Sequence, residues 1–150
     1  MTDIAFHFNV PDKLVYSCRL LRKAYASGAR VVVTGEPAQL AQLDQLLWTF
    51  SPLEFLPHVL VTPHAANADP ARMLATPVLL AASPKDCPHQ GVLVNLGLEV
   101  PDDFARFERF IELVSADADD RAAARRRWKH YAGMDFTIKQ HDLATAGAAA

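Results

Sequence analysis

Arg30-Val-Val-Val-Thr34 is the stretch of this sequence that decides the fold. Its three consecutive valines predict a short strand buried on both faces, which is typical of parallel sheets. Two similar apolar runs follow, Pro77-Val-Leu-Leu-Ala81 and Gly91-Val-Leu-Val-Asn-Leu96. The segment from Ile4 to Val10 predicts a further, aromatic strand near the N-terminus. The four runs together indicate a sheet that is largely parallel.

Helical periodicity fills the chain between these strands. From Lys13 to Ser27, and again after Pro37, apolar residues recur every three or four positions, which predicts two amphipathic helices. Gly28 is expected to end the first helix. Pro37 is expected to begin the second, because its fixed φ suits the first helical position. The apolar stripes are Leu14, Cys18, Leu21 and Tyr25 in the first helix, and Leu40, Leu43, Leu47 and Phe50 in the second.

A third helix is predicted after Asp102 or Asp103, either of which can cap it. Its apolar residues would be Phe104, Phe107, Ile111 and Val114. The segment from Val59 to Ala75 is rich in Pro, Ala, Asn and Asp, and we expect it to wrap around the surface. Strands that alternate with helices predict an α/β fold. We expect a single open, largely parallel sheet with helices on both faces, similar to a Rossmann fold.

The composition is that of a folded protein of one domain. Of 150 residues 51% are apolar, and the formal net charge is −2. No apolar run approaches the roughly 20 residues of a membrane span, and no signal segment is recognisable. Cys18 and Cys87 lie in dissimilar contexts, so we expect reduced thiols and a cytoplasmic protein. Residues 1–143 are expected to form the domain, and residues 144–150 a flexible C-terminal tail.

The motifs of cofactor chemistry are missing. The turn after the first valine-rich strand reads Thr34-Gly-Glu-Pro-Ala38, with one glycine and neither a dinucleotide-binding nor a phosphate-loop pattern. His58 and His64 share a proline-containing loop, and Cys87-Pro-His89 offers two ligands where a structural zinc needs four. His7 is expected to be a hydrogen-bonded histidine of the sheet. We therefore expect no cofactor, no metal and no catalytic residue.

Arg121 to Tyr131 is the most basic stretch of the chain. It holds five of the 15 Lys and Arg residues, and three aspartates just before it favour a helix N-terminus. At 3.6 residues per turn, Arg121, Arg125, Trp128 and Lys129 fall within an arc of roughly 100°. Guanidinium groups beside an indole suit a ligand that carries carboxylates or phosphates and an apolar group. The alternative is a solvated arginine face, with Trp128 packed on the body of the protein.

Trp48 lies off the apolar stripe of the second helix, by about 120°. An indole in that position has two explanations. It can pack on the following loop, from Ser51 to His58, or it can belong to a protein interface together with Phe55. The residues alone leave both open.

Taken in order, these motifs resemble the chi subunit of bacterial DNA polymerase III holoenzyme. The similarity covers nearly the whole chain, and the order of the motifs is more specific than any one of them. The matching features are the aromatic first strand, Leu43-Asp44-x-x-Leu47-Trp48, Phe55-x-Pro57-His58, the two later strands, Phe104-x-x-Phe107, and Ala124-Arg125-x-Arg127-Trp128-Lys129-x-Tyr131.

The resemblance implies a non-catalytic accessory subunit of DNA replication. Chi-like proteins bind the acidic C-terminal tail of the single-stranded DNA-binding protein, which ends in a phenylalanine carboxylate. Through another surface they bind the psi subunit and thereby the clamp loader. Carried over by motif, the tail-binding positions are Arg121, Arg125, Trp128 and Lys129, and the positions that face psi are Trp48 and Phe55. The family pattern has tyrosine at the position of Trp128.

Two other functions compete with this one. The basic helix could bind single-stranded nucleic acid directly, with phosphates on the arginines and a base stacked on Trp128. The slightly acidic net charge of the chain and the small size of its basic patch predict few phosphate contacts. Any contact with DNA would therefore be weak or indirect. An enzyme at the carboxyl edge of the sheet is the third class, and no motif supports it. No contact with a membrane is expected.

Overall fold

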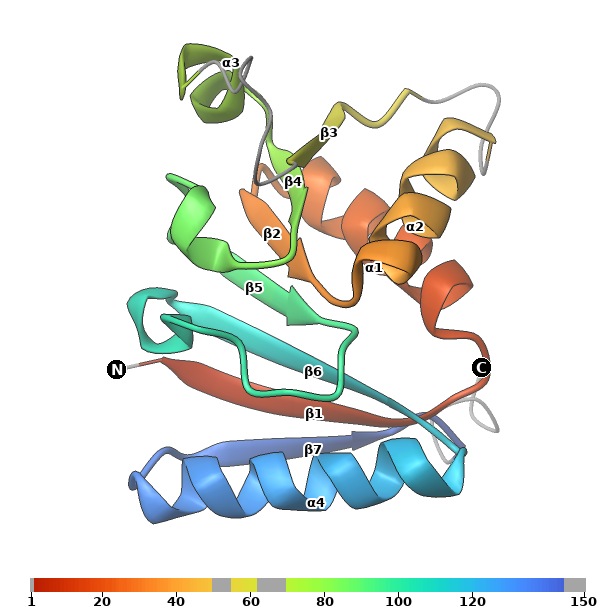
Figure 1. Cartoon of the computed structure of the whole chain (residues 1–150), viewed down its shortest axis with the longest axis vertical. Coiled ribbons are helices and arrows are strands. Elements are labelled where there is room, and N and C mark those ends of the chain that lie inside the picture. Colours follow the sequence, from red (N-terminus) through yellow and green to blue (C-terminus); the bar gives the residue numbers. More distant parts are fainter. Residues whose placement is uncertain (1, 50–54, 62–69, 145–150) are drawn as a thin grey trace.

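The core of the structure is a parallel sheet that runs through the whole molecule (Figure 1). The computed structural model describes residues 2–49, 55–61 and 70–144. In this part of the chain seven strands pair in the order β3-β4-β2-β5-β6-β1-β7, and every pairing is parallel. The strands are β1 (Asp3–Val10), β2 (Val31–Thr34), β3 (His58–Val61), β4 (Val78–Ala81), β5 (Val92–Asn95), β6 (Arg109–Ser115) and β7 (Ile138–Asp142).

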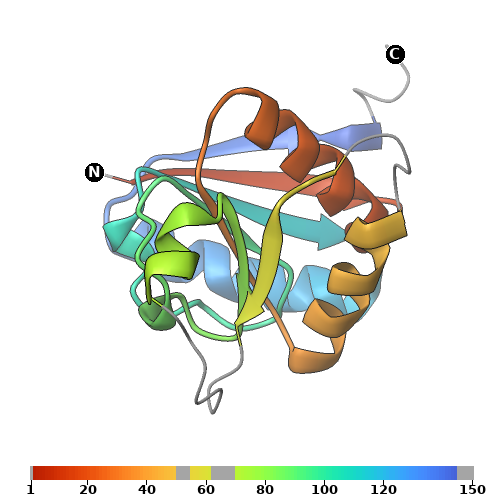
Figure 2. The ribbon, with the colours of Figure 1, turned by 90° about the horizontal axis from the view of Figure 1, so that it is seen from above.

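Helices cover both faces of this sheet, as Figure 2 shows from above. Between β1 and β2 lies α1 (Lys13–Ala26), and between β2 and β3 lies α2 (Pro37–Thr49). Both pack on one face, over an aliphatic core. The other face carries an aromatic core beneath α4 (Ala118–Gly133), which runs beside β7 at the edge of the sheet (Figure 1). The predicted α/β class, with an open parallel sheet and helices on both faces, is therefore confirmed.

The valine-rich strand and the first two helices form where the sequence predicts them. All four residues of β2 are buried. Asp12 caps α1 by accepting hydrogen bonds from two backbone N–H groups of its first turn, and Gly28 follows that helix with φ of +82°. Tyr25 is an exception to the predicted stripe, since its side chain is 41% exposed. Leu40, Leu43 and Leu47 are buried as expected, and Phe50 lies outside the described residues.

The predicted third helix is wrong. Residues 109–115 form β6, which lies between β5 and β1 near the middle of the sheet, and only Phe104–Arg106 make one 3-10 turn. Asp103 precedes that turn but forms no capping hydrogen bond. Five successive residues of β6, Phe110 to Val114, are buried, which requires a strand with apolar contacts on both faces. The spacing of four apolar residues in this region mimics a helical stripe by coincidence.

Three further elements differ from the prediction. The segment from Val59 to Ala75 contains most of the edge strand β3 and a short helix, α3 (Pro70–Ala75), while residues 62–69 lie outside the description. The segment from Ser83 to His89, by contrast, is the turn or loop that the sequence predicts, and it includes a 3-10 turn, Pro84–Asp86. At the opposite edge, β7 was not predicted, because its side chains are largely exposed and polar. Of the expected tail, only Ala144 is among the described residues.

Among the residues described, no helix is both long enough and apolar enough to cross a lipid bilayer. Both cysteines are free thiols and both are buried.

His7 on β1 contacts the hydroxyl of Tyr16 through its Nδ1, at 2.5 Å, so the predicted hydrogen-bonded histidine of the sheet is confirmed. Burial, together with the nearby His141 and Arg109, lowers the pKa of His7 to about 4.

Candidate functional site

The basic segment forms α4 because its N-terminus is capped and its interior favours a helix. The Asp117 carboxylate accepts a hydrogen bond from the backbone N–H of Asp120, as predicted for a capping aspartate. Asp119 and Asp120 complement the positive end of the helix dipole in the first turn. The alanines that follow have the highest helix propensity.

A second aspartate fastens the start of α4 to the sheet. The Asp120 carboxylate accepts hydrogen bonds from the backbone N–H and the hydroxyl of Ser115, both at 2.8 Å, and it pairs with the Lys13 ammonium at 3.1 Å. Burial alone would raise the pKa of Asp120, but these donors lower it below its ordinary value. One buried carboxylate thus joins α4 to β6 and α1.

The basic residues of α4 separate onto two faces. Arg121, Arg125 and Lys129 are exposed, whereas Arg127 is 1% exposed and points into the core. A cluster of arginines in the sequence is therefore two sets of residues with different environments. Only the exposed set can meet a ligand directly.

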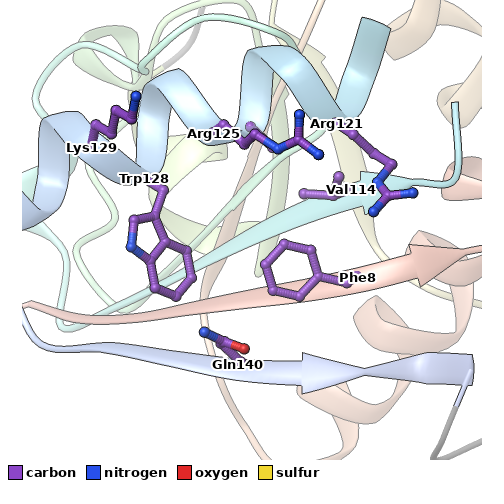
Figure 3. A pocket seen from close by; sticks show the side chains of 8 residues that line it. Phe8, Val114, Arg121, Arg125, Trp128, Lys129 and Gln140 are labelled. Atoms are coloured by element: carbon purple, nitrogen blue, oxygen red, sulfur yellow. The ribbon is translucent and has the colours of Figure 1, made fainter. Parts of the chain in front are cut away.

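A pocket of about 330 Å³ lies between the exposed face of α4 and the sheet (Figure 3). All four residues that the sequence predicts for the tail site line it, so the structure brings them together along one cavity wall. Its volume is at the lower end of the range typical of small-ligand pockets, roughly 300–1,000 Å³. The lining residues are Phe8, Val114, Arg121, Ala124, Arg125, Trp128, Lys129 and Gln140.

The apolar wall of the pocket is aromatic. Trp128 is partly buried, and its indole lies on Phe6, with ring centroids 4.9 Å apart, and beside Phe8 at 6.2 Å. Such tilted contacts stabilise the rings against each other and hold the indole in place. Neither of the predicted alternatives for Trp128 excludes the other, because one side of the indole packs on the body of the protein while the residue also lines the pocket.

The rim of the pocket is positively charged. Arg121 and Arg125 point toward the cavity from successive turns of α4 in Figure 3. Neither they nor Lys129 form a hydrogen bond or ion pair with another described residue. Among the described residues that line the cavity there is no Asp or Glu. Three unpaired cations around an apolar wall attract a ligand that has negative charge and an apolar end.

Sequence reasoning missed four residues of this pocket, of which Ala124 lies on α4 itself. Phe8 lies on β1 two positions after Phe6, so both rings face α4, and this alternation could have identified it. Val114 and Gln140 lie on β6 and β7. No local signal could identify these two, because one strand was predicted as a helix and the other was not predicted.

Between α4 and the sheet lies a buried polar cluster, formed by Glu112, Arg127, Tyr131 and Asn95. The Glu112 carboxylate accepts hydrogen bonds from Arg127 Nε at 2.9 Å, from the Tyr131 hydroxyl at 2.6 Å and from Asn95 Nδ2 at 2.8 Å. Burial raises the pKa of Glu112, and the Arg127 guanidinium and the other donors oppose that rise. Burial and the adjacent Glu112 carboxylate also raise the pKa of Tyr131, which keeps its hydroxyl protonated.

Trp48 and Phe55 form a second surface, the aromatic ledge, at the other edge of the sheet. Their side chains are 55% and 65% exposed, and their ring centroids lie 5.6 Å apart. Of the two explanations left open for Trp48, packing on the following loop is confirmed, since the indole lies 4.8 Å from the His58 ring. The protein interface stays a prediction. Two large aromatic rings remain accessible to a partner.

A histidine supports the aromatic ledge from below. His58 Nδ1 lies 2.7 Å from the carbonyl oxygen of Leu56, and its Nε2 lies 3.1 Å from the Asp44 carboxylate on α2. The His58 ring of β3 thus contacts both Trp48 and Asp44, two residues of α2.

The loops that follow β2 and β5 approach each other closely at the carboxyl edge of the sheet. Ligands of open α/β sheets bind outside the carboxyl ends of strands such as β2 and β5. Here Gly35 and Gly97 follow those strands at close approach: a Cβ on Gly97 would lie 3.3 Å from Gly35 Cα, and a Cβ on Gly35 would lie 3.1 Å from Leu96 Cβ. In the part of the chain that is described, no three His, Cys, Asp or Glu residues are placed to hold a metal ion.

One family and two named proteins are similar to this chain. The model of the family described as DNA polymerase III chi subunit, HolC, matches residues 1–139. A Pseudomonas aeruginosa protein named DNA polymerase III subunit chi is 32% identical over 132 residues, which cover 87% of this chain and 87% of that protein. A Haemophilus influenzae protein of the same name is 30% identical over 115 residues, or 75% of each chain.

Proposed function

Because this chain belongs to the DNA polymerase III chi subunit family, we propose that it joins the single-stranded DNA-binding protein to the clamp loader during replication. In this proposal the α4 pocket binds the acidic, phenylalanine-ended tail of the single-stranded DNA-binding protein. The aromatic ledge binds psi. The chain acts in the cytoplasm as an accessory subunit without catalytic activity of its own.

The observation that carries the proposal is the chemistry of the pocket. A peptide tail that is acidic and ends in phenylalanine presents carboxylates and one aromatic ring within a few ångströms of each other. The pocket presents Arg121, Arg125 and Lys129 on its rim and Trp128 with Phe8 as its apolar wall. Guanidinium groups can bind carboxylates with two parallel hydrogen bonds, which fixes the orientation of the chain end.

The aromatic ledge supports the second half of the proposal. Two neighbouring exposed aromatic side chains are uncommon on a surface that only contacts water, and aromatic residues are enriched where proteins bind each other. The His58 ring packs on Trp48 and lies 3.1 Å from the Asp44 carboxylate, so the indole has a buried support. Psi is proposed as that partner because the sequence resembles chi-like proteins at Trp48 and Phe55.

Parallel titrations of two ligands test the tail proposal. Fluorescence anisotropy should report binding of an acidic peptide ending in phenylalanine in the micromolar range, near −8 kcal/mol. A single-stranded oligonucleotide of equal charge should bind much more weakly, because the pocket offers only three unpaired cations. Equal or tighter binding of the oligonucleotide would favour direct nucleic-acid binding instead. Binding of neither ligand would refute the proposed role of the pocket.

A further inference from the structure

The direction in which the α4 side chains of the pocket point depends on how α4 is rotated about its own axis. Arg121 and Arg125 lie on one shoulder of the helix, while Arg127 lies about 120–160° around it, toward the core. A rotation of about 20° would move a side-chain tip by roughly 2 Å, since a helix with its side chains has a radius of 5–6 Å. Binding constellations tolerate only about 0.5 Å. Some contact must therefore hold the rotation of α4.

Apolar packing alone does not specify the rotation of α4. Its buried face includes Ala123 and Ala124, whose small side chains do not interlock with the sheet. Trp128 and Tyr131 pack on Phe6, and Arg127 and Tyr131 donate hydrogen bonds to Glu112 of the sheet. Hydrogen bonds are directional, whereas contacts between methyl groups are not. The contacts that specify an angle are therefore the polar ones.

We infer that the buried Glu112–Arg127–Tyr131 cluster positions the candidate peptide site by locking α4 in one rotation on the sheet. Arg127 and Tyr131 lie four residues apart on one face of α4, and both donate to the same oxygen of Glu112, at 2.9 and 2.6 Å. Two donors from successive turns on one acceptor leave the helix little freedom to roll. Trp128, Arg125 and Arg121 are then directed at the pocket.

The cluster also joins this helix to the carboxyl edge of the sheet. Arg127 Nη1 donates to the Leu98 carbonyl at 2.9 Å. Asn95 Nδ2 donates both to Glu112 and to the Glu99 carbonyl, at 2.8 and 3.1 Å. Asn95 at the end of β5 and the helix α4 are thus bound to the same carboxylate, that of Glu112.

Stability is a poor explanation for this cluster. Buried ion pairs often stabilise a fold no better than well-packed apolar residues of similar volume. Here Arg127 Nη2 is buried and makes no hydrogen bond with any described residue, which further reduces the benefit. Stability alone does not require the Glu112–Arg127 ion pair, whereas holding the rotation of α4 gives it a function.

An apolar replacement of the three residues that join α4 to β6 separates the two roles. The triple variant Glu112→Leu, Arg127→Met, Tyr131→Phe leaves no buried charge without its partner, and Asn95 keeps its hydrogen bond to the Glu99 carbonyl. Each variant is made in a Trp48→Phe background, so that Trp128 alone reports fluorescence. We expect a folded protein with near wild-type cooperativity, Trp128 quenched at least twofold more by acrylamide, and peptide affinity reduced about five- to tenfold. Arg126→Met, an exposed arginine of the same helix outside the pocket, should change neither property.

The two measurements keep this inference distinct from the proposed function on which it rests. Unchanged Trp128 quenching in the folded triple variant would overturn the locking role, whether or not the wild type binds the peptide. Failure of the wild type to bind would refute the function alone. If the triple variant does not fold, Tyr131→Phe decides by the same measurements, since it removes one hydroxyl and leaves the ion pair. Increased quenching and two- to threefold weaker binding support the role, and wild-type behaviour in both overturns it.

Discussion

The α4 pocket and the aromatic ledge each present an indole at the surface, but in different surroundings. In the pocket, Trp128 is partly buried against Phe6 and surrounded by cations. On the ledge, Trp48 is 55% exposed, and its neighbours are another aromatic ring and a histidine. The first arrangement combines charge with an apolar wall. The second offers apolar area alone.

The difference teaches what each surface can discriminate. A pocket rimmed by arginines distinguishes ligands by charge and by the position of a chain end, and its affinity falls with salt. A projecting aromatic pair distinguishes partners by shape and depends little on salt. Variants that alter one surface and leave the other intact can test this contrast.

Reversing one pocket charge should have the largest effect. Arg125→Glu replaces attraction of the peptide by repulsion and should weaken binding about 30-fold, equivalent to about 2 kcal/mol. Arg126→Glu is the matched control, with the same charge change on an exposed position of the same helix that does not line the pocket. Anisotropy titrations at two salt concentrations measure both variants. If the two substitutions weaken binding equally, the pocket attracts by net charge and does not contact the peptide at Arg125.

Acid should loosen the pocket before the ledge. The lowered pKa of Asp120 means that its carboxylate stabilises the fold above the ordinary aspartate value, near 3.9, and that this contribution is lost as pH falls through the lower folded-state pKa. Asp120→Asn removes charged hydrogen bonds and should lower the free energy of unfolding by about 1.5 kcal/mol at pH 7.

Single-tryptophan proteins separate the two regions in this experiment. Trp128 emission in a Trp48→Phe protein should change at a higher pH than Trp48 emission in a Trp128→Phe protein. The stability difference caused by Asp120→Asn should shrink as the pH falls toward 3. Identical transitions for both indoles, with an undiminished difference, would show that Asp120 does not secure α4 selectively.

A double-mutant cycle should give a smaller, local effect. Trp128→Ala should weaken peptide binding about tenfold while its salt dependence persists, because the cations remain. Deleting the final phenylalanine of the peptide should weaken binding to the wild type strongly and to Trp128→Ala much less. The expected coupling is about 1 kcal/mol, typical of aromatic pairs. Additive losses would show that Trp128 and the phenylalanine do not touch, and the shared pocket would be abandoned.

Truncating the ledge should affect peptide binding least. Trp48→Ala removes an exposed ring, so the peptide affinity should stay within error and the free energy of unfolding should fall by less than about 1 kcal/mol. Binding to psi, measured by calorimetry, should weaken by at least tenfold. A protein that no longer folds would show that Trp48 belongs to the core, and the contrast between the two surfaces would fail at that position.

Sequence alone predicts those parts of the molecule whose pattern is local. The valine run of β2 has one good explanation, and helical periodicity places Arg121, Arg125, Trp128 and Lys129 together without further information. In β6, by contrast, apolar residues at positions 104, 107, 111 and 114 fit a helical period, although every residue from 110 to 114 is buried as in a central strand.

Other features depend on contacts between distant segments. Nothing near Arg127 in the sequence distinguishes it from Arg125 or Arg126, and its burial is explained only by Glu112, which lies on the strand that was predicted as a helix. The polar strand β7 is recognisable as a strand only through its pairing with β1. Local sequence patterns therefore cannot predict the environment of residues that depend on contacts between distant segments.

The order of the strands separates the two surfaces by a fixed length. The ledge adjoins β3 and the pocket adjoins β7, which are the two edges of the sheet. Six spacings of about 4.8 Å place these edges roughly 29 Å apart. The sheet is then a rigid spacer: two ligands held at its ends would neither compete nor collide. If the two ligands belong to one assembly, binding of the first raises the effective concentration of the second at its own site. Two modest affinities then act together as avidity.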